Sequence, residues 1–229
     1  MTAHCILISI FKTSLLNLIP RFYNIKSGDI KIDNQSIYQT KIKSLRNQIS
    51  LVSQDTTLFD DTIRNNIAYA KFDATDDEIS KACKFAAAEE FINKMPEKYN
   101  TIVGENGIKL SGGQKQRICI ARALAAEPDL IICDEVTSAL DQIVQEGILK
   151  LLLRLQKELS ITYIFITHDI ATVKAISDEV VVMHNGLVVE QGMKSEIFSP
   201  PHPDYTKLLL SSVPEMDPNW LTKILSSKK

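Results

Sequence analysis

Residues 110–135 read LSGGQKQRICIARALAAEPDLIICDE and carry the strongest structural signals in the chain. Two adjacent glycines, Gly112 and Gly113, precede the segment 115–126, in which apolar residues recur at a spacing that predicts a helix. Glycine lets main-chain amides approach a ligand, and the start of a helix carries partial positive charge. The glycines therefore indicate either a seat for an anion or an ordinary loop and helix cap, and these two interpretations stay open.

The same segment ends in two adjacent carboxylates, Asp134 and Glu135, after an apolar run that predicts a buried strand. Successive strand residues point to opposite sides, so one acid can hold a cation while the other orients a water molecule. The alternative is that the pair only caps the following helix. Residues 138–141 (SALD) follow at once and add a compact polar turn.

Polar residues follow three of the chain's apolar runs. The runs consist almost entirely of Ile, Leu and Val and predict buried parallel strands; they are Ile6–Phe11, Ile49–Ser53, Leu130–Cys133 and Tyr163–Thr167. Gln54 follows the second run, Asp134 with Glu135 the third and His168 the fourth. Ligands bind beyond the carboxyl ends of strands in open α/β sheets, so we expect these side chains to converge on one crevice. A solvent-facing glutamine and a core histidine are the alternatives.

Three further signals organise the rest of the chain. Residues 75–78 (TDDE) form a capping box ahead of a helical pattern, within a middle lobe of roughly 58 to 126. Two strand-like runs surround Asn185-Gly186, which predicts a hairpin. The tail from residue 199 to residue 229 is rich in proline and predicts an extension that wraps the surface.

Composition narrows the class of protein. The 229 residues are 45% hydrophobic and 24% charged, which suits one globular core and excludes a disordered or coiled-coil chain. The net charge of -2 gives no electrostatic reason to expect nucleic acid as the partner. The four cysteines form no CxxC pair, so we expect buried thiols in a reducing compartment. Apolar runs are far shorter than a membrane span, and we expect cytoplasmic residence.

Taken together, these motifs resemble the ATP-binding domain of ABC transporters. Their order and spacing match from Lys12 to about Gly192, and the combination of LSGGQ with Asp134-Glu135 is highly specific. The resemblance implies an α/β fold, with a P-loop NTPase (RecA-like) core containing a parallel sheet, an α-helical signature subdomain, and an N-terminal antiparallel β-subdomain that is largely missing. The implied domains are a core lobe (1–57 and 127–198), the signature subdomain (58–126) and a C-terminal extension (199–229).

The resemblance also implies ATP and Mg²⁺ as ligands and gives each motif a role. Asp134 and Thr13 lie on the metal side, and Gln54 touches both metal and water. Glu135 polarises the attacking water, and His168 lies near the γ-phosphate, so Glu135, His168 and Gln54 are the implied catalytic residues. The implied nucleotide-binding residues are Lys12, Thr13, Ser111, Gly112, Gly113, Gln114 and Asp141.

Partners and transport direction follow from the same resemblance. The signature closes over ATP held by a second ATPase domain in a head-to-tail dimer, and transmembrane permease subunits hold the pair at the inner face of the cell membrane. Residues 59–68 and 101–107 resemble ABC exporters, where the second motif contacts the membrane domain. The segments from Asp134 onward, including 201–218, resemble oligopeptide or dipeptide importers. The tail is the more distinctive signal and favours a peptide importer.

The phosphate-binding loop departs from the family pattern. Lys12-Thr13 fits the end of G-x-x-x-x-G-K-[ST], but Ile6 and Phe11 occupy the glycine positions. Side chains there cost roughly 1 to 2 kcal/mol each and intrude on the phosphate volume. We therefore expect weak ATP binding. A frameshift or a misplaced start codon fits this pattern, and the alternative function is a nucleotide-binding-defective remnant that acts only as a structural partner.

Overall fold

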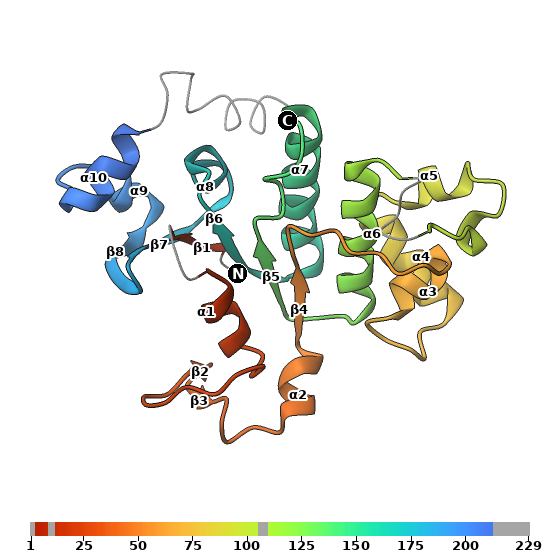
Figure 1. The fold of residues 1–229 in the computed structure, drawn as a ribbon, viewed down its shortest axis with the longest axis horizontal. Coiled ribbons are helices and arrows are strands. Elements are labelled where there is room, and N and C mark those ends of the chain that lie inside the picture. The colour runs from red at the N-terminus through yellow and green to blue at the C-terminus, as the bar shows by residue number, and fades with distance from the viewer. Residues whose placement is uncertain (1–2, 9–11, 105–109, 213–229) are drawn as a thin grey trace. The chain divides into compact units, whose positions relative to one another are not determined.

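The protein is an α/β structure whose described residues form two compact units. The computed structural model describes residues 3–8, 12–104 and 110–212, with side chains from residue 15 onward. Unit 1 combines residues 1–49 with 162–229, and unit 2 consists of residues 50–161. Figure 1 shows strands and helices alternating along the chain, and this confirms the predicted α/β class.

A sheet with the strand order β6-β1-β7-β8 forms the centre of unit 1. β1 runs parallel to both β6 and β7, whereas β8 is antiparallel to β7. These strands are β1 (Ala3–Ile8), β6 (Thr162–Thr167), β7 (Glu179–His184) and β8 (Leu187–Met193). The central position of β1, with a parallel neighbour on each side, gives this half of the chain the parallel core that the family fold requires.

Short helices and one small hairpin complete unit 1. The hairpin consists of β2 (Lys31–Ile32) and β3 (Gln35–Ser36), which pair antiparallel. The helices are α1 (Lys12–Leu18), α2 (Ile42–Asn47), α8 (Ile170–Ile176), α9 (Lys194–Ile197) and α10 (Asp204–Ser211). Within the extension, Tyr205 of α10 stacks on His184 at the end of β7, with ring centroids 3.9 Å apart.

The β7–β8 hairpin has the two-residue turn that the sequence predicts. Asn185 and Gly186 both have positive φ, 50° and 79°, as a type I′ turn requires. Asparagine tolerates the left-handed region better than most residues, and glycine enters it without a steric penalty. The Asn-Gly signal therefore located this hairpin correctly.

The first strand differs from its prediction. It runs from Ala3 to Ile8 rather than from Ile6 to Phe11, because main-chain pairing begins where Ala3 lies opposite Tyr163. Ala3 and His4 carry no apolar signal, so the sequence placed the strand too late. Phe11 lies outside the described residues, and the other three predicted strands agree with β4, β5 and β6 to within one residue.

Unit 2 contains two neighbouring strands and most of the long helices. The arrows of these two strands, β4 (Ile49–Val52) and β5 (Leu130–Asp134), point the same way in Figure 1. β4 ends its sheet, and Val52 is buried as predicted, whereas Leu51 is 48% exposed and departs from the predicted buried strand. The elements are β4 (Ile49–Val52), α3 (Ile63–Ala68), α4 (Asp76–Phe85), α5 (Glu89–Asn93), the 3-10 helix η1 (Lys98–Asn100), α6 (Gly112–Ala125), β5 (Leu130–Asp134) and α7 (Gln142–Leu159).

The core of unit 2 forms where α6 packs against α3 and α4. Ile63 and Ile67 of α3, Ile79 of α4 and Ile118 of α6 are almost completely buried there. The thiol of Cys83 on α4 is also buried, which raises its pKa to about 12. Among the described cysteines, Cys83, Cys119 and Cys133 form no disulfide, and Cys83 and Cys133 are buried, as the sequence predicted.

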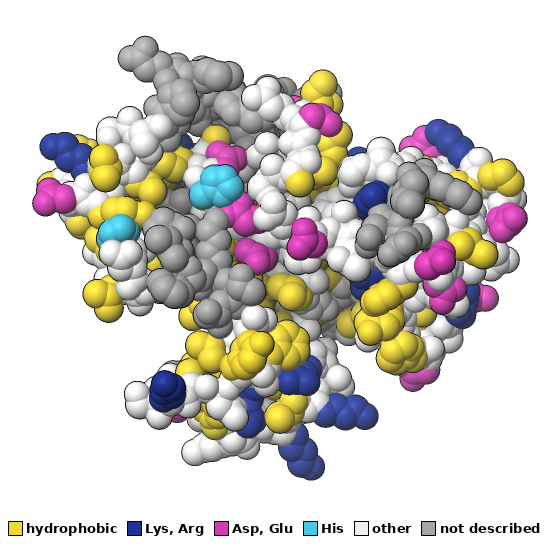
Figure 2. Space-filling model, in the orientation of Figure 1, with side chains coloured by type: hydrophobic (Ala, Val, Ile, Leu, Met, Phe, Trp, Pro, Cys, Tyr) yellow, Lys and Arg dark blue, Asp and Glu magenta, His cyan; other side chains and the backbone are white. Residues whose placement is uncertain are grey.

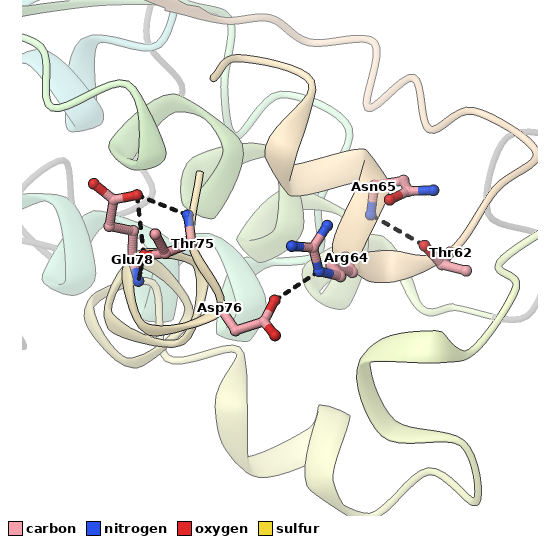
Figure 3. A network of polar contacts seen from close by, with 6 residues as sticks. All are labelled: Thr62, Arg64, Asn65, Thr75, Asp76 and Glu78. Carbon is pink, nitrogen blue, oxygen red and sulfur yellow. Dashed lines mark hydrogen bonds and ion pairs between the residues drawn. The ribbon is translucent and has the colours of Figure 1, made fainter. Parts of the chain in front are cut away.

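Caps fix where α3 and α4 begin (Figure 3). Thr75 accepts a hydrogen bond from the Glu78 main-chain N–H, and the Glu78 carboxylate accepts one from the Thr75 N–H, so the predicted capping box is confirmed. Thr62 caps α3 in a similar way through the Asn65 N–H at 3.1 Å. An ion pair of 2.7 Å between Arg64 and Asp76 links the two helices.

The predicted division of the chain into a core lobe, a signature subdomain and a C-terminal extension, with boundaries at residues 57/58, 126/127 and 198/199, stays a prediction.

Glu78 makes the stability of unit 2 depend on pH. Its hydrogen bond with the Lys71 ammonium, and then those with Thr75, lower the pKa of Glu78 from 4.5 to about 2. The Glu78 carboxylate therefore contributes its full stabilisation to the fold when the pH is above its ordinary pKa of 4.5. This stabilisation is lost as the pH falls towards 2. We expect the urea midpoint to decrease between pH 5 and pH 2.5, and to decrease less in Glu78→Gln. The Glu97→Gln variant is the control, and an equal decrease in both variants would contradict this assignment.

Candidate functional site

Two carboxylates lie where β5 ends in unit 2. Asp134 is the last residue of the strand, and Glu135 follows it with only 7% of its surface exposed. The Glu135 carbonyl accepts two hydrogen bonds from Ser138, from the main-chain N–H at 3.1 Å and from Oγ at 2.9 Å. The SALD turn therefore folds back on Glu135 and fixes the position of its backbone.

The backbone of Glu135 is strained. Its φ of 51° lies in the left-handed region, where a side chain costs about 1 to 2 kcal/mol. Strained residues persist when the surrounding structure holds them, and they gather at active sites. A buried, strained glutamate directly after a strand therefore favours a chemical role over the alternative that the acid pair only caps the next helix.

Gln54 comes two residues after β4, the strand beside β5. The strands lie next to each other and run the same way, so Gln54 lies at the edge of the sheet that also presents Asp134. The side chain of Gln54 is exposed, which leaves its amide available to a ligand. These two strand ends are thus brought together within unit 2 as the sequence predicts.

The signature glycines form the first turn of α6. The helix begins at Gly112, three residues before the predicted start, because Ser111 and Gln114 form a second capping box. The Gln114 N–H donates to Ser111 Oγ at 3.3 Å, and the Ser111 N–H donates to Gln114 Oε1 at 3.0 Å. The N–H groups of Gly112 and Gly113 are first-turn donors that have no partner within a helix. The arrangement is therefore both a cap and a pair of amides that can meet an anion.

Close packing against the start of α7 and the turn that precedes it explains why both positions are glycine. A Cβ atom on Gly113 would lie 2.7 Å from Val144 Cγ1, and one on Gly112 would lie 3.2 Å from Leu140 Cδ2. Asp141 caps α7, because Val144 N–H donates to its Oδ1 at 3.0 Å. The carboxylate of Asp141, predicted to bind nucleotide, thus already has a structural partner.

His168 and the start of α1 both belong to unit 1. β6 and β1 are parallel neighbours with Leu7 opposite Thr167, so His168 follows the paired end of β6, and Lys12 begins α1 shortly after the end of β1. The His168 side chain is exposed. The side chains of Lys12 and Thr13 lie outside the described residues. The convergence of His168 with Gln54 and Glu135, which belong to the other unit, stays a prediction.

Unit 2 carries an aromatic patch made of Phe59, Tyr69 and Phe72, which was not predicted from the sequence. The Phe59 and Tyr69 rings are 4.4 Å apart, the Tyr69 and Phe72 rings are 5.5 Å apart, and Phe72 is 82% exposed. Figure 2 shows hydrophobic side chains gathered on this part of the surface. Ile102, 52% exposed, lies nearby through a bridge to Thr62. The two exporter-like segments are therefore neighbours.

Arg122 joins this patch to the signature helix. Its guanidinium donates to the carbonyls of Asn66 at 2.7 Å and Thr57 at 3.0 Å, and to Asn66 Oδ1 at 2.9 Å. It also lies 5.4 Å from the centre of the Phe59 ring. Burial lowers the pKa of Arg122, but three accepting oxygens hold its charge. No sequence signal pairs residue 66 with residue 122, so this link was missed.

The residues around the end of β5 fit Mg²⁺, which takes some of its ligands from water and phosphate, better than they fit a metal ion whose ligands all come from the protein. The described residues contain no group of three His, Cys, Asp or Glu side chains that could hold an ion. Mg²⁺ keeps several waters and binds through one or two carboxylates plus substrate phosphates. Asp134, half-buried at a strand end, supplies the oxygen ligand that such a site needs.

Over the described ranges, no helix is both long and apolar enough to span a membrane.

Two family models match the chain. The model described as "ABC transporter" covers residues 12–138, and the one described as "Oligopeptide/dipeptide transporter, C-terminal region" covers residues 189–229. The first match contains the signature and the two carboxylates. The second lies over β8 and the extension, in agreement with the peptide-transporter resemblance of the tail.

Curated relatives are similar over most of the chain. The ATP-dependent lipid A-core flippase of Legionella pneumophila (strain Paris) is 46% identical over 81% of this chain and 31% of its own length. A putative multidrug export ATP-binding/permease protein of Bacillus subtilis (strain 168) is 48% identical over 81% of this chain and 32% of its own. This chain therefore spans about a third of the length of these two relatives.

A solved structure, described as a bacterial Atm1-family ABC exporter with ATP bound, is 38% identical with a TM-score of 0.76. The match covers 86% of this chain and 34% of that one. It supports the α/β fold that the strands of each unit show.

We expect the Gly113→Ala substitution to destabilise the fold, because its Cβ would meet Val144 at 2.7 Å. Overpacking of this kind costs about 1 to 3 kcal/mol, measured as the loss of unfolding free energy in urea. Shortening the opposing side chain, in Gly113→Ala with Val144→Ala, should recover part of that loss.

The Gly147→Ala variant is the matched control. An added Cβ there meets only Arg117 Nη2 at 3.9 Å, so alanine should stabilise α7 by about 0.5 to 1 kcal/mol. Equal effects at Gly113 and Gly147 would show that close packing does not explain the signature glycines.

Proposed function

This chain belongs to the ABC transporter family, and we propose that it is the ATP-binding subunit or domain that couples ATP hydrolysis to transport across a membrane. The observation that carries the proposal is the buried, strained Glu135 directly after Asp134 at the end of β5. It lies in the same unit as Gln54 and the signature helix, in the order that the family requires.

The proposed reaction is attack of water on the γ-phosphate of ATP. Asp134, with Gln54 and Thr13, would hold the Mg²⁺, which neutralises phosphate charge when it is bound. Glu135 orients the attacking water and accepts its proton, while His168 contacts the γ-phosphate. Lys12 neutralises charge on the β- and γ-phosphates. Positioning and charge supply most of the catalysis in phosphoryl transfer, so none of these residues needs to form a covalent bond.

The proposed partner for hydrolysis is a second ATPase domain. The first-turn amides of Gly112 and Gly113 face outward from a capped helix, which suits an anion supplied by another subunit. Because Ser111 and Gln114 already cap this helix, their side chains hold the turn in shape while the amides meet the phosphate. Asp141 supports the same turn from the start of α7.

The aromatic patch is the proposed docking surface for the transmembrane partner. Exposed apolar surface of this kind marks interaction sites. Phe59 and Tyr69 lie beside the segment around Ile102, one of the two exporter-like motifs. Docking there would hold the chain at the inner face of the cell membrane.

Peptides are the proposed cargo, on the evidence of the tail. The oligopeptide/dipeptide C-terminal model matches residues 189–229. Two relatives that match the larger part of the chain are described as a lipid A-core flippase and as a putative multidrug export protein. The proposal therefore assigns the cargo class from β8 and the extension, and leaves the direction of transport to experiment.

Native ATP affinity is expected to be low, because Ile6 and Phe11 replace phosphate-loop glycines. Ile6 lies within β1, where it pairs with Ile166 and Val181, so the cost of a side chain in left-handed backbone is expected at position 11 only. Restoring glycine at position 11 should therefore strengthen Mg-ATP binding about 5-fold to 30-fold, since such a side chain costs about 1 to 2 kcal/mol. Calorimetric titration with Mg-ATP measures this change. A micromolar dissociation constant for the native chain would contradict the expectation.

Hydrolysis is then measured as phosphate release from the glycine-restored chain. Adding Glu135→Gln should reduce turnover by about 10²- to 10⁴-fold while ATP binding remains. If the restored chain binds no ATP, the ATP-binding role fails and the structural-remnant alternative is favoured. If it binds ATP and turnover is independent of Glu135, the assigned role of that residue fails.

Membrane docking is tested with Tyr69→Ser combined with Phe72→Ser. Both side chains are at least half exposed, so the melting temperature should change little, whereas sedimentation with membrane vesicles from the source organism should fall several-fold. Ile143→Ser is the control, because Ile143 is 83% exposed on α7 outside the patch. Equal losses in both variants would show that the patch has no special part in docking.

A further inference from the structure

A cavity of about 240 Å³ lies in unit 2, separate from the proposed ATP site. It forms between α4, the last turn of α6, the loop 126–129 and the end of α7. Asp129 lines it and directly precedes β5, whereas Glu135 follows the other end of that strand. The five strand residues between them place these two acids roughly 20 Å apart along the strand. The cavity is therefore a distinct candidate binding site.

About half of the cavity's lining surface is apolar. Ala82 of α4, Leu124 of α6 and Ile161 after α7 are buried, with no more than 7% of their surface exposed. Phe85 adds an aromatic ring and Leu159 a further branched side chain. A compact apolar group could displace water from these walls and gain the free energy of apolar burial.

The charged residues at the cavity favour a cation. Three carboxylates line it, those of Glu78, Glu127 and Asp129, against one ammonium, that of Lys81. Glu78 already pairs with Lys71 at 2.5 Å, and Glu127 lies 3.9 Å from Lys81. Within the described ranges, the Asp129 carboxylate forms no hydrogen bond or ion pair. The Asp129 side chain is exposed, so its negative charge is compensated by water and remains available to a cationic ligand.

We propose that this cavity binds a small organic monocation, an ammonium group joined to a compact apolar or aromatic body. The body packs against Phe85 and Leu124, and the ammonium lies at the Asp129 carboxylate. A volume below the roughly 300 to 1,000 Å³ of drug-binding pockets limits the ligand to a compact molecule. An anion of the same shape is repelled by the three carboxylates, and a neutral molecule gains nothing from Asp129.

Three probes of one shape test the charge requirement: 2-phenylethylammonium, 2-phenylethanol and 3-phenylpropanoate. We expect the ammonium to bind with a dissociation constant of about 0.1 to 1 mM, followed by amide NMR shifts in a titration of the nucleotide-free chain. The alcohol should bind about threefold to fivefold more weakly, and the carboxylate should not saturate. Shifts should centre on residues 81–85 and 124–129. Equal binding of all three probes, or no saturable binding of the ammonium, would overturn the proposal.

Variants locate the charge and the cavity. Asp129→Asn should weaken ammonium binding about threefold to fivefold and leave the alcohol unchanged, whereas Asp60→Asn, an exposed acid of the same unit outside the cavity, should change neither. Ala82→Leu should fill the cavity and abolish binding of both probes while the melting curve stays cooperative. If that variant does not fold, Asp129→Asn and the three-probe comparison still decide. An unchanged ammonium affinity in Asp129→Asn would refute the site.

Discussion

The contact between the first turns of α6 and α7 is the constraint on which unit 2 depends. Val144 occupies the space that a side chain at Gly113 would need, and Leu140 lies almost as close to Gly112. Glycine at these two positions therefore serves two purposes at once. They let the helices approach, and they leave main-chain N–H groups uncovered at the start of α6. Replacing either glycine would disturb packing and anion binding together.

A second feature ties this contact to the carboxylates. The chain leaves β5 through the left-handed Glu135, turns back through hydrogen bonds from Ser138, and enters α7 through the Asp141 cap. Strain at Glu135 is offset by these local bonds. On the other face of the helical region, Arg122 links α6 to the aromatic patch. α6 thus carries the signature turn at its start and contacts the aromatic patch through Arg122.

Sequence reasoning predicted much of this arrangement where a local rule applied. The Asn185-Gly186 turn and the Thr75 capping box follow from residue types at fixed spacing, and both were found. The start of α6 was misplaced, although Ser111 and Gln114 carry the same capping signal. Long-range partnerships could not be predicted, because the bond between Arg122 and Asn66 joins residues 56 positions apart. The position of β1 likewise depends on pairing with two distant strands rather than on its own apolar pattern.

The buried thiols of unit 2 have a practical consequence. At a pKa of about 12, Cys83 is almost entirely protonated at neutral pH, and the protonated thiol is a poor nucleophile towards alkylating reagents. Cys133 is enclosed within β5. Both can therefore be alkylated quickly only when α4 or β5 opens. Mass spectrometry of iodoacetamide-treated peptides would then report the opening of each element separately, without an introduced label.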